Sequence, residues 1–377
     1  MYKMKNILIT GGAGFIGSRL CEKLFDKGYN ITVMDNLSSQ VHGNGGSFLF
    51  NRIKGKCTFI NGDVRNKDDW KKAIKGQDII AHLAAETGTG QSMYEIEKYN
   101  DVNIMGTAYM LELLNTLNHK VKKIIIASSR AIYGEGKYLC PNHGVIYPNQ
   151  RNKLDMDRQV FNPKCDLCSS ELKLAATDEK SKIHPTSIYG ITKQQQEQMI
   201  MLTGASLGIP SVSFRYQNVY GPGQSLANPY TGILSIFSTS ILNGNDLDIY
   251  EDGEESRDFI YIEDAVDATI LGIEKEDANG EVFNVGSGFA TTVRQVSEAL
   301  KNYYNAEINI LISGKYRLGD IRHNYADLSK INHVLGFKPN YDFQKGISEF
   351  VSWVKTQEIM EDKYQSSIIK LKEKGLM

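Results

Sequence analysis

Apolar and polar positions alternate through the first part of the chain in two kinds of block. Short apolar runs have the length of buried strands, and the longer segments between them repeat apolar residues at helical spacing. The predicted strands are 7–9, 31–34, 57–60, 78–83, 123–127 and 211–215. The predicted helices are 15–27, 68–74, 99–117 and 187–207. Strands that alternate with helices in this way predict an α/β fold, a Rossmann doubly wound parallel sheet.

The pattern changes twice along the chain. Residues 135–185 carry several prolines and no clear amphipathic period, which indicates an inserted loop or small subdomain. From residue 228 short strands alternate with helices again, and a charged helix over 347–374 is predicted to close the chain. We expect a Rossmann domain over 1–227 with the insert 135–185, a smaller α/β substrate lobe over 228–350 that partly returns to the first domain, and a C-terminal helix over 351–377.

The first strand, turn and helix carry the most specific motif. Glycines 11, 12, 14 and 17 lie between the strand and the helix, where they permit a tight turn, a close approach of backbone to a pyrophosphate, and close packing of helix on strand. Asp35 ends the second strand 18 residues after Gly17, where its carboxylate can accept the hydroxyls of a ribose. With an acid there and no arginine beside it, the sequence favours NAD over NADP.

Composition narrows the class of protein. The 377 residues include 43 basic and 44 acidic side chains and no basic block, so we expect no nucleic-acid partner. No apolar run is long enough to cross a membrane, and the first strand leaves no room for a signal peptide, which predicts a cytoplasmic protein without a membrane partner. Five cysteines, an odd number, argue against a disulfide framework.

Candidate acid–base chemistry lies on the helix 187–207. Tyr189 and Lys193 are four residues apart and share one helical face, so that the ammonium group of Lys193 is expected to lower the pKa of the phenol. Tyr189 would then exchange a proton with a substrate hydroxyl near neutral pH. Ser129 follows the fifth strand, at the edge of the sheet where ligands bind.

Taken together, these motifs resemble the extended short-chain dehydrogenases/reductases of the NAD-dependent sugar epimerase/dehydratase group. The matching segments are GGAGFIG (11–17), HLAA (82–85), Asn103 with Gly106-Thr107, SSRAIYG (128–134), YGITK (189–193), RYQNVYGP (215–222) and RDFIYI (257–262). The resemblance implies Ser129, Tyr189 and Lys193 as the catalytic residues. It implies a cofactor site formed by Gly11, Gly14, Phe15, Ile16, Gly17, Asp35, Asn36, Asp63, Val64, Leu83, Ala84, Ala85, Asn103, Tyr189 and Lys193. It implies a nucleotide-sugar substrate held by Thr87, Ser129, Arg130, Asn218, Arg257, Arg317 and Asp320, with the arginines at its pyrophosphate.

The residues beside Ser129 favour one reaction of this group. Dehydratases of the group carry an acidic pair just after the catalytic hydroxyl, and here those positions are Arg130 and Ala131. Elimination therefore lacks its acid and base, and the expected reaction is reversible hydride transfer at C4. In it Tyr189 takes the proton of the C4 hydroxyl, NAD takes the hydride, and the keto-sugar receives it back on its other face.

A finer resemblance is to dTDP-L-rhamnose 4-epimerases. It rests on Asp35-Asn36-Leu37 with Gln40-Val41-His42-Gly43 and on residues 86–95, while Ser39 stands where proline is expected. Alternatives are a UDP- or CDP-hexose epimerase, a sugar-nucleotide dehydrogenase or reductase, and an NAD-binding protein of this fold that has lost catalysis. The intact set of Ser129, Tyr189 and Lys193 argues against the last of these.

Two further features are not explained by the sheet. In the insert, Cys140 with His143 and Cys165 with Cys168 form two pairs with ligand spacing, which predicts a structural zinc site of three thiolates and one imidazole. The insert segment Tyr147–Arg151 is placed to reach the substrate. The helices 99–117 and 187–207 carry apolar residues beyond one stripe (Met105, Tyr109, Met110, Met199, Ile200, Met201), and in the resembled family such helices pair across a two-fold axis, so we expect a homodimer.

Overall fold

A seven-stranded sheet organises this computed structural model, which describes residues 5–43, 48–228, 230, 232–360, 362 and 373–374. The strand order is β14-β9-β5-β4-β1-β2-β3, and every neighbouring pair is parallel. The chain builds outward from β1 to β3 and then crosses to β4 on the other side of β1, which creates the reversal point where ligands of open α/β sheets bind. The strands are β1 (Asn6–Thr10), β2 (Asn30–Asp35), β3 (Thr58–Asn61), β4 (Ile79–His82), β5 (Lys123–Ser129), β9 (Ser211–Tyr216) and β14 (Val282–Val285).

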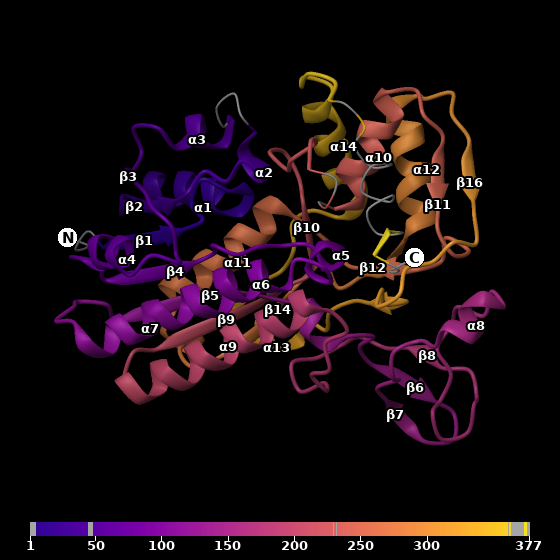
Figure 1. Cartoon of the computed structure of the whole chain (residues 1–377), viewed down its shortest axis with the longest axis horizontal. Coiled ribbons are helices and arrows are strands. Elements are labelled where there is room, and N and C mark those ends of the chain that lie inside the picture. Colours follow the sequence, from indigo (N-terminus) through magenta and orange to yellow (C-terminus); the bar gives the residue numbers. More distant parts are fainter. Residues whose placement is uncertain are drawn as a thin grey trace.

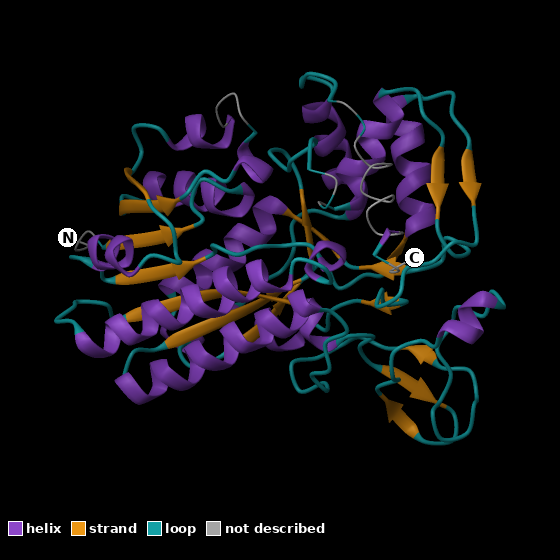
Figure 2. Cartoon of the chain, viewed as in Figure 1, coloured by secondary structure: helices purple, strands orange, loops and turns teal. Residues whose placement is uncertain are grey.

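Helices cover both faces of this sheet (Figures 1 and 2). Because successive side chains of a strand point to opposite faces, Ile7 and Ile9 enter one core cluster and Leu8 enters another. The first cluster is covered by α1 (Phe15–Asp26), α3 (Phe48–Ile53) and α11 (Ile262–Glu274), and the second by α4 (Lys67–Ile74), α7 (Gly106–Thr116) and α9 (Ile188–Leu207). The predicted doubly wound α/β fold is confirmed.

The predicted helix 99–117 is not a single α-helix. A short helix α6 (Ile96–Tyr99) passes into a π-helical turn, η1 (Asn100–Met105), before α7 begins. The turn lies where the chain packs tightly, since a Cβ on Gly106 would lie 2.9 Å from Cγ2 of Val64. Such turns are frequent at functional sites, and this one carries Asn103 toward the loop after β4. Apolar spacing in a sequence has no signal for this change of helix type.

A smaller lobe lies beside the large sheet. Its helices pack together, with α12 contacting both α10 and α14, and α12 begins with a capping box formed by Thr292 and Gln295. The lobe contains α10 (Ile233–Leu242), α12 (Val293–Tyr304), α14 (Phe343–Val354), and the parallel pair β11 (Leu247–Ile249) and β16 (Ile310–Ile312). Further short strands are β10 (Asn218–Tyr220) with β13 (Phe259–Tyr261), and β12 (Ser256–Arg257) with β15 (Thr291–Thr292) and β17 (His323–Asn324). Between them, β14 joins the large sheet and α13 (Ser329–Leu335) packs against it.

The predicted C-terminal helix is wrong over part of its length. The last long helix, α14, begins at Phe343, where the carboxylate of Asp342 accepts a hydrogen bond from the backbone of Lys345, and it ends at Val354. Residues 355–360 are not helical. Most of 361–377 lies outside the described residues. None of the helices in the described part of the chain is long and apolar enough to cross a membrane.

The insert has a small sheet of its own, seen at the lower right of Figure 1. Strand β6 (Tyr138–Cys140) pairs antiparallel with β7 (Gly144–Ile146) and with β8 (Lys173–Leu174), and a short helix, α8 (Lys153–Asp157), lies between β7 and β8 in sequence. Three short strands bury little apolar surface, so this unit needs other contacts to hold its shape.

Candidate active site

The glycine turn after β1 is fixed by close backbone contacts. Gly11 has a φ of +67°, and a Cβ there would lie 2.7 Å from the amide nitrogen of Ala84. A Cβ on Gly17 would lie 2.3 Å from the carbonyl oxygen of Gly11, and one on Gly14 would lie 3.1 Å from it. The contacts at Gly11 and Gly17 exclude any side chain and the one at Gly14 is tight, and the resulting cradle at the N-terminus of α1 has the shape and the free amides that a pyrophosphate requires.

The acid at the end of β2 faces this turn. Oδ2 of Asp35 accepts a hydrogen bond of 3.0 Å from the backbone of Ala13, and Oδ1 accepts one of 2.9 Å from the backbone of Leu37. The buried carboxylate is thereby held in one orientation. Each oxygen has a second lone pair, so Asp35 can still accept ribose hydroxyls.

Asp63 lies at the neighbouring strand end and is paired more strongly than the sequence indicates. Its carboxylate accepts hydrogen bonds from Asn36 at 3.0 Å and from Nη2 of Arg65 at 2.8 Å. The hydrogen bonds from Arg65 lower the pKa of Asp63 to about 2. Arg65 was missed at the sequence level because nothing in its spacing marks it as a partner of Asp63.

Asn103 is brought to the site, but its side chain is fully buried and used internally. Its carboxamide accepts from the backbone amide of Glu86 at 2.8 Å, donates to the carbonyl of Glu86 at 3.1 Å, and donates to Oγ1 of Thr192 at 2.9 Å. These contacts connect the loop after β4, which includes Leu83, Ala84, Ala85 and the exposed Thr87, to α9. The geometry supports a role in positioning that loop.

Ser129, Tyr189 and Lys193 come together at the carboxyl end of β5. The hydroxyl of Ser129 accepts a hydrogen bond from the backbone of Ala131 and also forms one with the phenol of Tyr189. Helix α9 begins just before Tyr189, because Ser187 caps it by accepting from the backbone of Gly190. Desolvation raises the pKa of Tyr189, whereas the Ser129 hydrogen bond and the positive charge of Arg130 oppose this rise.

Lys193 does not act on Tyr189 as the sequence suggested. Its ammonium group donates to Oε1 of Gln196 at 2.7 Å, and burial lowers the pKa of Lys193 to about 7. Gln196 in turn donates to Thr107, which is hydrogen-bonded to the buried His82. In this structure the groups that lower the phenol pKa are Ser129 and Arg130, and Lys193 is not among them.

The residues expected at the substrate form a cationic group around one acid. Arg130 donates to Oδ1 of Asn218 at 3.2 Å, and Arg257 donates to Oδ1 of Asp320 at 3.2 Å. Burial alone would raise the pKa of Asp320, but the charges of four arginines outweigh it and the net shift is downward. Those arginines are Arg257, Arg317, Arg151 and Arg130. Arg317 was also expected at the substrate. Its guanidinium carbon lies over the ring of Tyr250, 4.9 Å from the ring centre.

The four predicted metal ligands of the insert meet in space. Cys140 lies at the end of β6, His143 in the turn before β7, and Cys165 and Cys168 in the loop before β8. Their ligand atoms all lie within 4.8 Å of one another. Sγ of Cys140 is 3.6 Å from both Nδ1 of His143 and Sγ of Cys168, and Sγ of Cys165 is 3.6 Å from Nδ1 of His143.

Comparison with known proteins decides the family. The sequence profile described as the NAD dependent epimerase/dehydratase family matches residues 7–153 and 169–286. The chain belongs to this family. The internal gap in this match, 154–168, contains two of the four clustered side chains of the insert. The family resemblance inferred from the motifs is confirmed. The prediction that the protein is an enzyme of the NAD-dependent epimerase type is confirmed as well.

Similar proteins extend over nearly the whole chain. A dTDP-L-rhamnose 4-epimerase from Burkholderia thailandensis is 35% identical over 93% of this chain and 95% of its own length. A solved UDP-glucose 4-epimerase with UDP-glucose from Thermotoga maritima has a TM-score of 0.76 and 30% identity, covering 93% of this chain and 98% of its own. A UDP-glucuronic acid 4-epimerase from Bacillus cereus, solved with UDP-glucuronic acid and NAD, has a TM-score of 0.75 and 25% identity over 93% and 99%.

Proposed function

We propose that this protein is a nucleotide-sugar 4-epimerase that uses tightly bound NAD and passes through a transient 4-keto sugar. The observation that carries the proposal is the meeting of Ser129 and Tyr189 at the end of β5, with Arg130 and Ala131 next to them where a dehydratase needs acids. Burial lowers the pKa of Arg130 only to about 10, so its guanidinium remains charged and cannot serve as an acid–base group near neutral pH.

The described residues fit a nicotinamide dinucleotide. The turn that excludes any Cβ at Gly11 and Gly17 offers backbone amides to the pyrophosphate, and Asp35 offers its carboxylate to the adenosine ribose. Bound NAD would supply a reversible hydride acceptor at the sugar carbon. Lys193, which lies one helical turn after Tyr189, would hold the nicotinamide ribose.

The proton transfers fall to the protein. Tyr189 would take the proton of the C4 hydroxyl and return it after the keto-sugar has turned, while Ser129 hydrogen-bonds the same oxygen and orients it. The group of arginines that includes Arg257 and Arg317 would bind the pyrophosphate of the nucleotide-sugar, because guanidinium forks match phosphate oxygens. Such an anchor at the pyrophosphate would leave the sugar itself free to rotate between two faces.

The substrate pair we favour is dTDP-L-rhamnose and dTDP-6-deoxy-L-talose. Its support is the similarity to the Burkholderia thailandensis enzyme over nearly the full length of both chains. A UDP-hexose is the second candidate, supported by the fold match to the Thermotoga maritima enzyme with UDP-glucose.

A panel of dTDP-, UDP-, CDP- and GDP-sugars, followed by NMR for inversion at C4, tests this function. We expect inversion of one sugar with no net formation of NADH. Replacing the proposed base, Tyr189→Phe, should keep NAD bound and lower kcat by ~10²–10⁴. Accumulation of NADH in step with product would instead identify a dehydrogenase, and an active Tyr189→Phe variant would show that another group is the base.

We also propose that the insert binds one structural Zn²⁺ through Cys140, His143, Cys165 and Cys168. Two thiolates bound to one zinc at about 2.3 Å in a tetrahedron lie about 3.8 Å apart. The 3.6 Å between Sγ of Cys140 and Sγ of Cys168 is close to this value. A thiolate and an imidazole nitrogen bound at about 2.3 and 2.05 Å would lie about 3.6 Å apart, as Nδ1 of His143 does from Sγ of Cys140 and of Cys165. Metal analysis of protein purified without added zinc should find about one zinc per chain, which the paired change Cys165→Ser and Cys168→Ser should abolish. Folded, active protein without metal would contradict the site.

A further inference from the structure

The insert reaches the substrate lobe through a buried arginine. Arg151 follows β7 in the insert, and its side chain is 4% exposed. Nη1 of Arg151 donates to Oε2 of Glu251 at 2.8 Å, and Nε lies 3.3 Å from Oε1 of Glu135. Both carboxylates are themselves buried. Because unpaired buried charges are costly, Arg151 can hardly leave this position without a large loss of stability.

The same guanidinium holds the turn that carries two of the proposed substrate residues. Nη2 of Arg151 donates to the backbone carbonyl of Asp320 at 2.8 Å, while Arg257 binds the side chain of Asp320. The backbone amide of Asp320 donates to the carbonyl of Arg317 at 3.3 Å, so these two residues form one turn. Arg151 therefore fixes this turn, here called the Arg317–Asp320 turn, from the side of the insert.

The segment that carries Arg151 contacts the loop 165–168 through Asn149 and the chain leading into that loop through Arg151 itself. Before it, the backbone amide and Nδ2 of Asn149 both donate to Oδ2 of Asp166, which lies between Cys165 and Cys168. After it, Nη1 of Arg151 also donates to the carbonyl of Phe161, four residues before Cys165. A metal that orders the loop 165–168 would thus order both ends of the segment 149–161.

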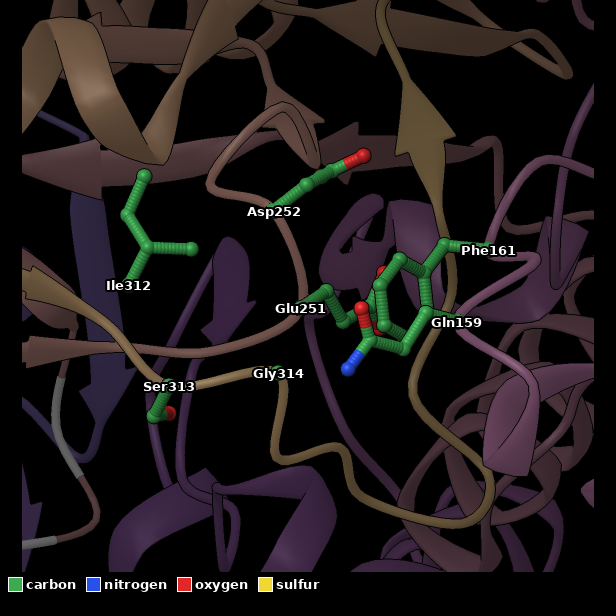
Figure 3. Close-up of a pocket in the computed structure, with 7 residues that line it drawn as sticks. All are labelled: Gln159, Phe161, Glu251, Asp252, Ile312, Ser313 and Gly314. Carbon is green, nitrogen blue, oxygen red and sulfur yellow. The ribbon is translucent and has the colours of Figure 1, made fainter.

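The junction between the insert and the lobe contains a cavity and several polar contacts. A cavity of about 240 Å³ lies at their junction, and its walls include Gln159 and Phe161 of the insert and Glu251 of the lobe (Figure 3). Around it the contact is polar, since Arg322 of the lobe also donates to Asn162 of the insert at 2.9 Å and to Glu251 at 2.9 Å. Arginine contacts therefore transmit the position of the insert to the lobe.

We propose that Arg151 is a positioning residue through which the metal-bound insert sets the affinity for the nucleotide-sugar. The metal orders the segment 149–161, Arg151 holds the Arg317–Asp320 turn, and that turn meets the pyrophosphate. The inference rests on the proposed function, because it needs the turn to bind a nucleotide-sugar. None of these hydrogen bonds involves the glycine turn or Asp35 of the proposed NAD site.

The test combines metal removal with the change Arg151→Ala. Binding of dTDP and UDP to NAD-loaded protein is measured by calorimetry for the parent, for Arg151→Ala, and for the matched control Arg158→Ala, which removes an exposed arginine of the same insert. Each protein is measured with zinc and after chelation. We expect chelation to weaken binding by roughly tenfold in the parent and the control, as for the loss of one charged hydrogen bond.

Arg151→Ala should show the same roughly tenfold loss with zinc present and no further loss on chelation, with unchanged NAD content and a rise in KM larger than the fall in kcat. Additive losses, or a chelated parent that binds as well as before, would overturn the inference.

If Arg151→Ala does not fold, the same comparison is made with Arg151→Lys. This variant keeps a charge beside Glu135 and Glu251 but cannot reach both backbone carbonyls. A parent that neither binds nucleoside diphosphates nor inverts any sugar contradicts the proposed function itself, whereas an active parent with unaffected Arg151 variants contradicts this inference alone.

Discussion

At the scale of single residues, the proposed base is tuned by its immediate neighbours. Tyr189 is partly buried and its desolvation raises its pKa, and the groups that counter the rise are the hydroxyl of Ser129 and the guanidinium of Arg130. Arg130 has no acid–base role of its own, yet its positive charge favours the phenolate. One residue thus stands where elimination would need an acid and also helps the proton transfer that epimerisation needs.

Replacing that charge should move the pH profile. Arg130→Met removes a positive charge near Tyr189, so the pKa of the phenol should rise and the acidic limb of kcat/KM, below which the base is protonated, should shift to higher pH by about one unit. Activity lost at pH 7 should then be partly recovered at higher pH. Arg294→Met, at an ion pair on the surface, is the control and should leave the profile in place. An unshifted limb in Arg130→Met would show that Arg130 does not act on the base.

Sequence reasoning at this scale succeeded where a residue has one physical reason to be present. The expected conformations of Gly11 and Gly17 are visible as contacts that exclude a side chain, and Asp35 lies at the strand end where its spacing placed it. It failed where a role depends on which of several nearby groups a charged side chain contacts, as for Lys193 with Gln196 or Asp63 with Arg65, since spacing alone does not show this choice.

At the scale of elements, the first β-α-β unit shows how tightly the cofactor turn is built. Gly17 is the third residue of α1, and a methyl group there would meet the carbonyl of Gly11 at 2.3 Å and Cα of Gly12 at 2.7 Å. Helix α1 would have to move away from β1 to accept it. Such a movement would displace the amides that face the pyrophosphate.

Gly17→Ala should therefore lose NAD before it loses its fold. Overpacking of this kind costs roughly 1–3 kcal/mol of stability, which a protein of this size can survive. The purified variant should contain little NAD, measured by its absorbance after denaturation, and show no epimerisation. Asp26→Ala, an exposed change in the last turn of the same helix, should retain NAD. Full NAD occupancy in Gly17→Ala would mean that close packing of α1 is not what forms the site.

Helices and strands were predicted correctly where the hydrophobic pattern alone determines them. Strand β5, for example, is an apolar run with clear limits on both sides. It was predicted over 123–127, and in the structure it continues two residues further, to Ser129. The π-helical turn at Asn100–Met105 could not be predicted, because apolar spacing does not distinguish a π-helical turn from an α-helix; the turn precedes the close approach of Gly106 to Val64. The predicted helix 347–374 extended too far because charged residues with helical spacing continue after Val354, where α14 ends.

At the scale of the whole molecule, the helices α7 and α9 lie side by side and present an outer surface. Of the apolar residues that suggested a dimer, Met110 and Ile200 are fully buried and belong to the core. The outward apolar residues of α9 are instead Ile191 and Leu202, which are 39% and 72% exposed, and Met105, the last residue of η1 before α7, is 41% exposed. We propose that these residues, the α7–α9 surface, form the contact of a homodimer around a two-fold axis.

A charge placed in this surface should dissociate the dimer. Leu202→Glu would bring two carboxylates close to the two-fold axis, where each loses water without gaining a partner. We expect light scattering at micromolar concentration to give the mass of two chains for the parent and of one chain for Leu202→Glu. The matched control is Leu154→Glu on α8, since Leu154 is 70% exposed but belongs to the insert and lies away from α7 and α9. If both variants keep the parent's mass, or if the parent itself is a monomer, the α7–α9 surface is not a dimer contact. If the control dissociates and Leu202→Glu does not, the contact between copies belongs to the insert instead, and the segment that holds Arg151 would lie close to a second chain.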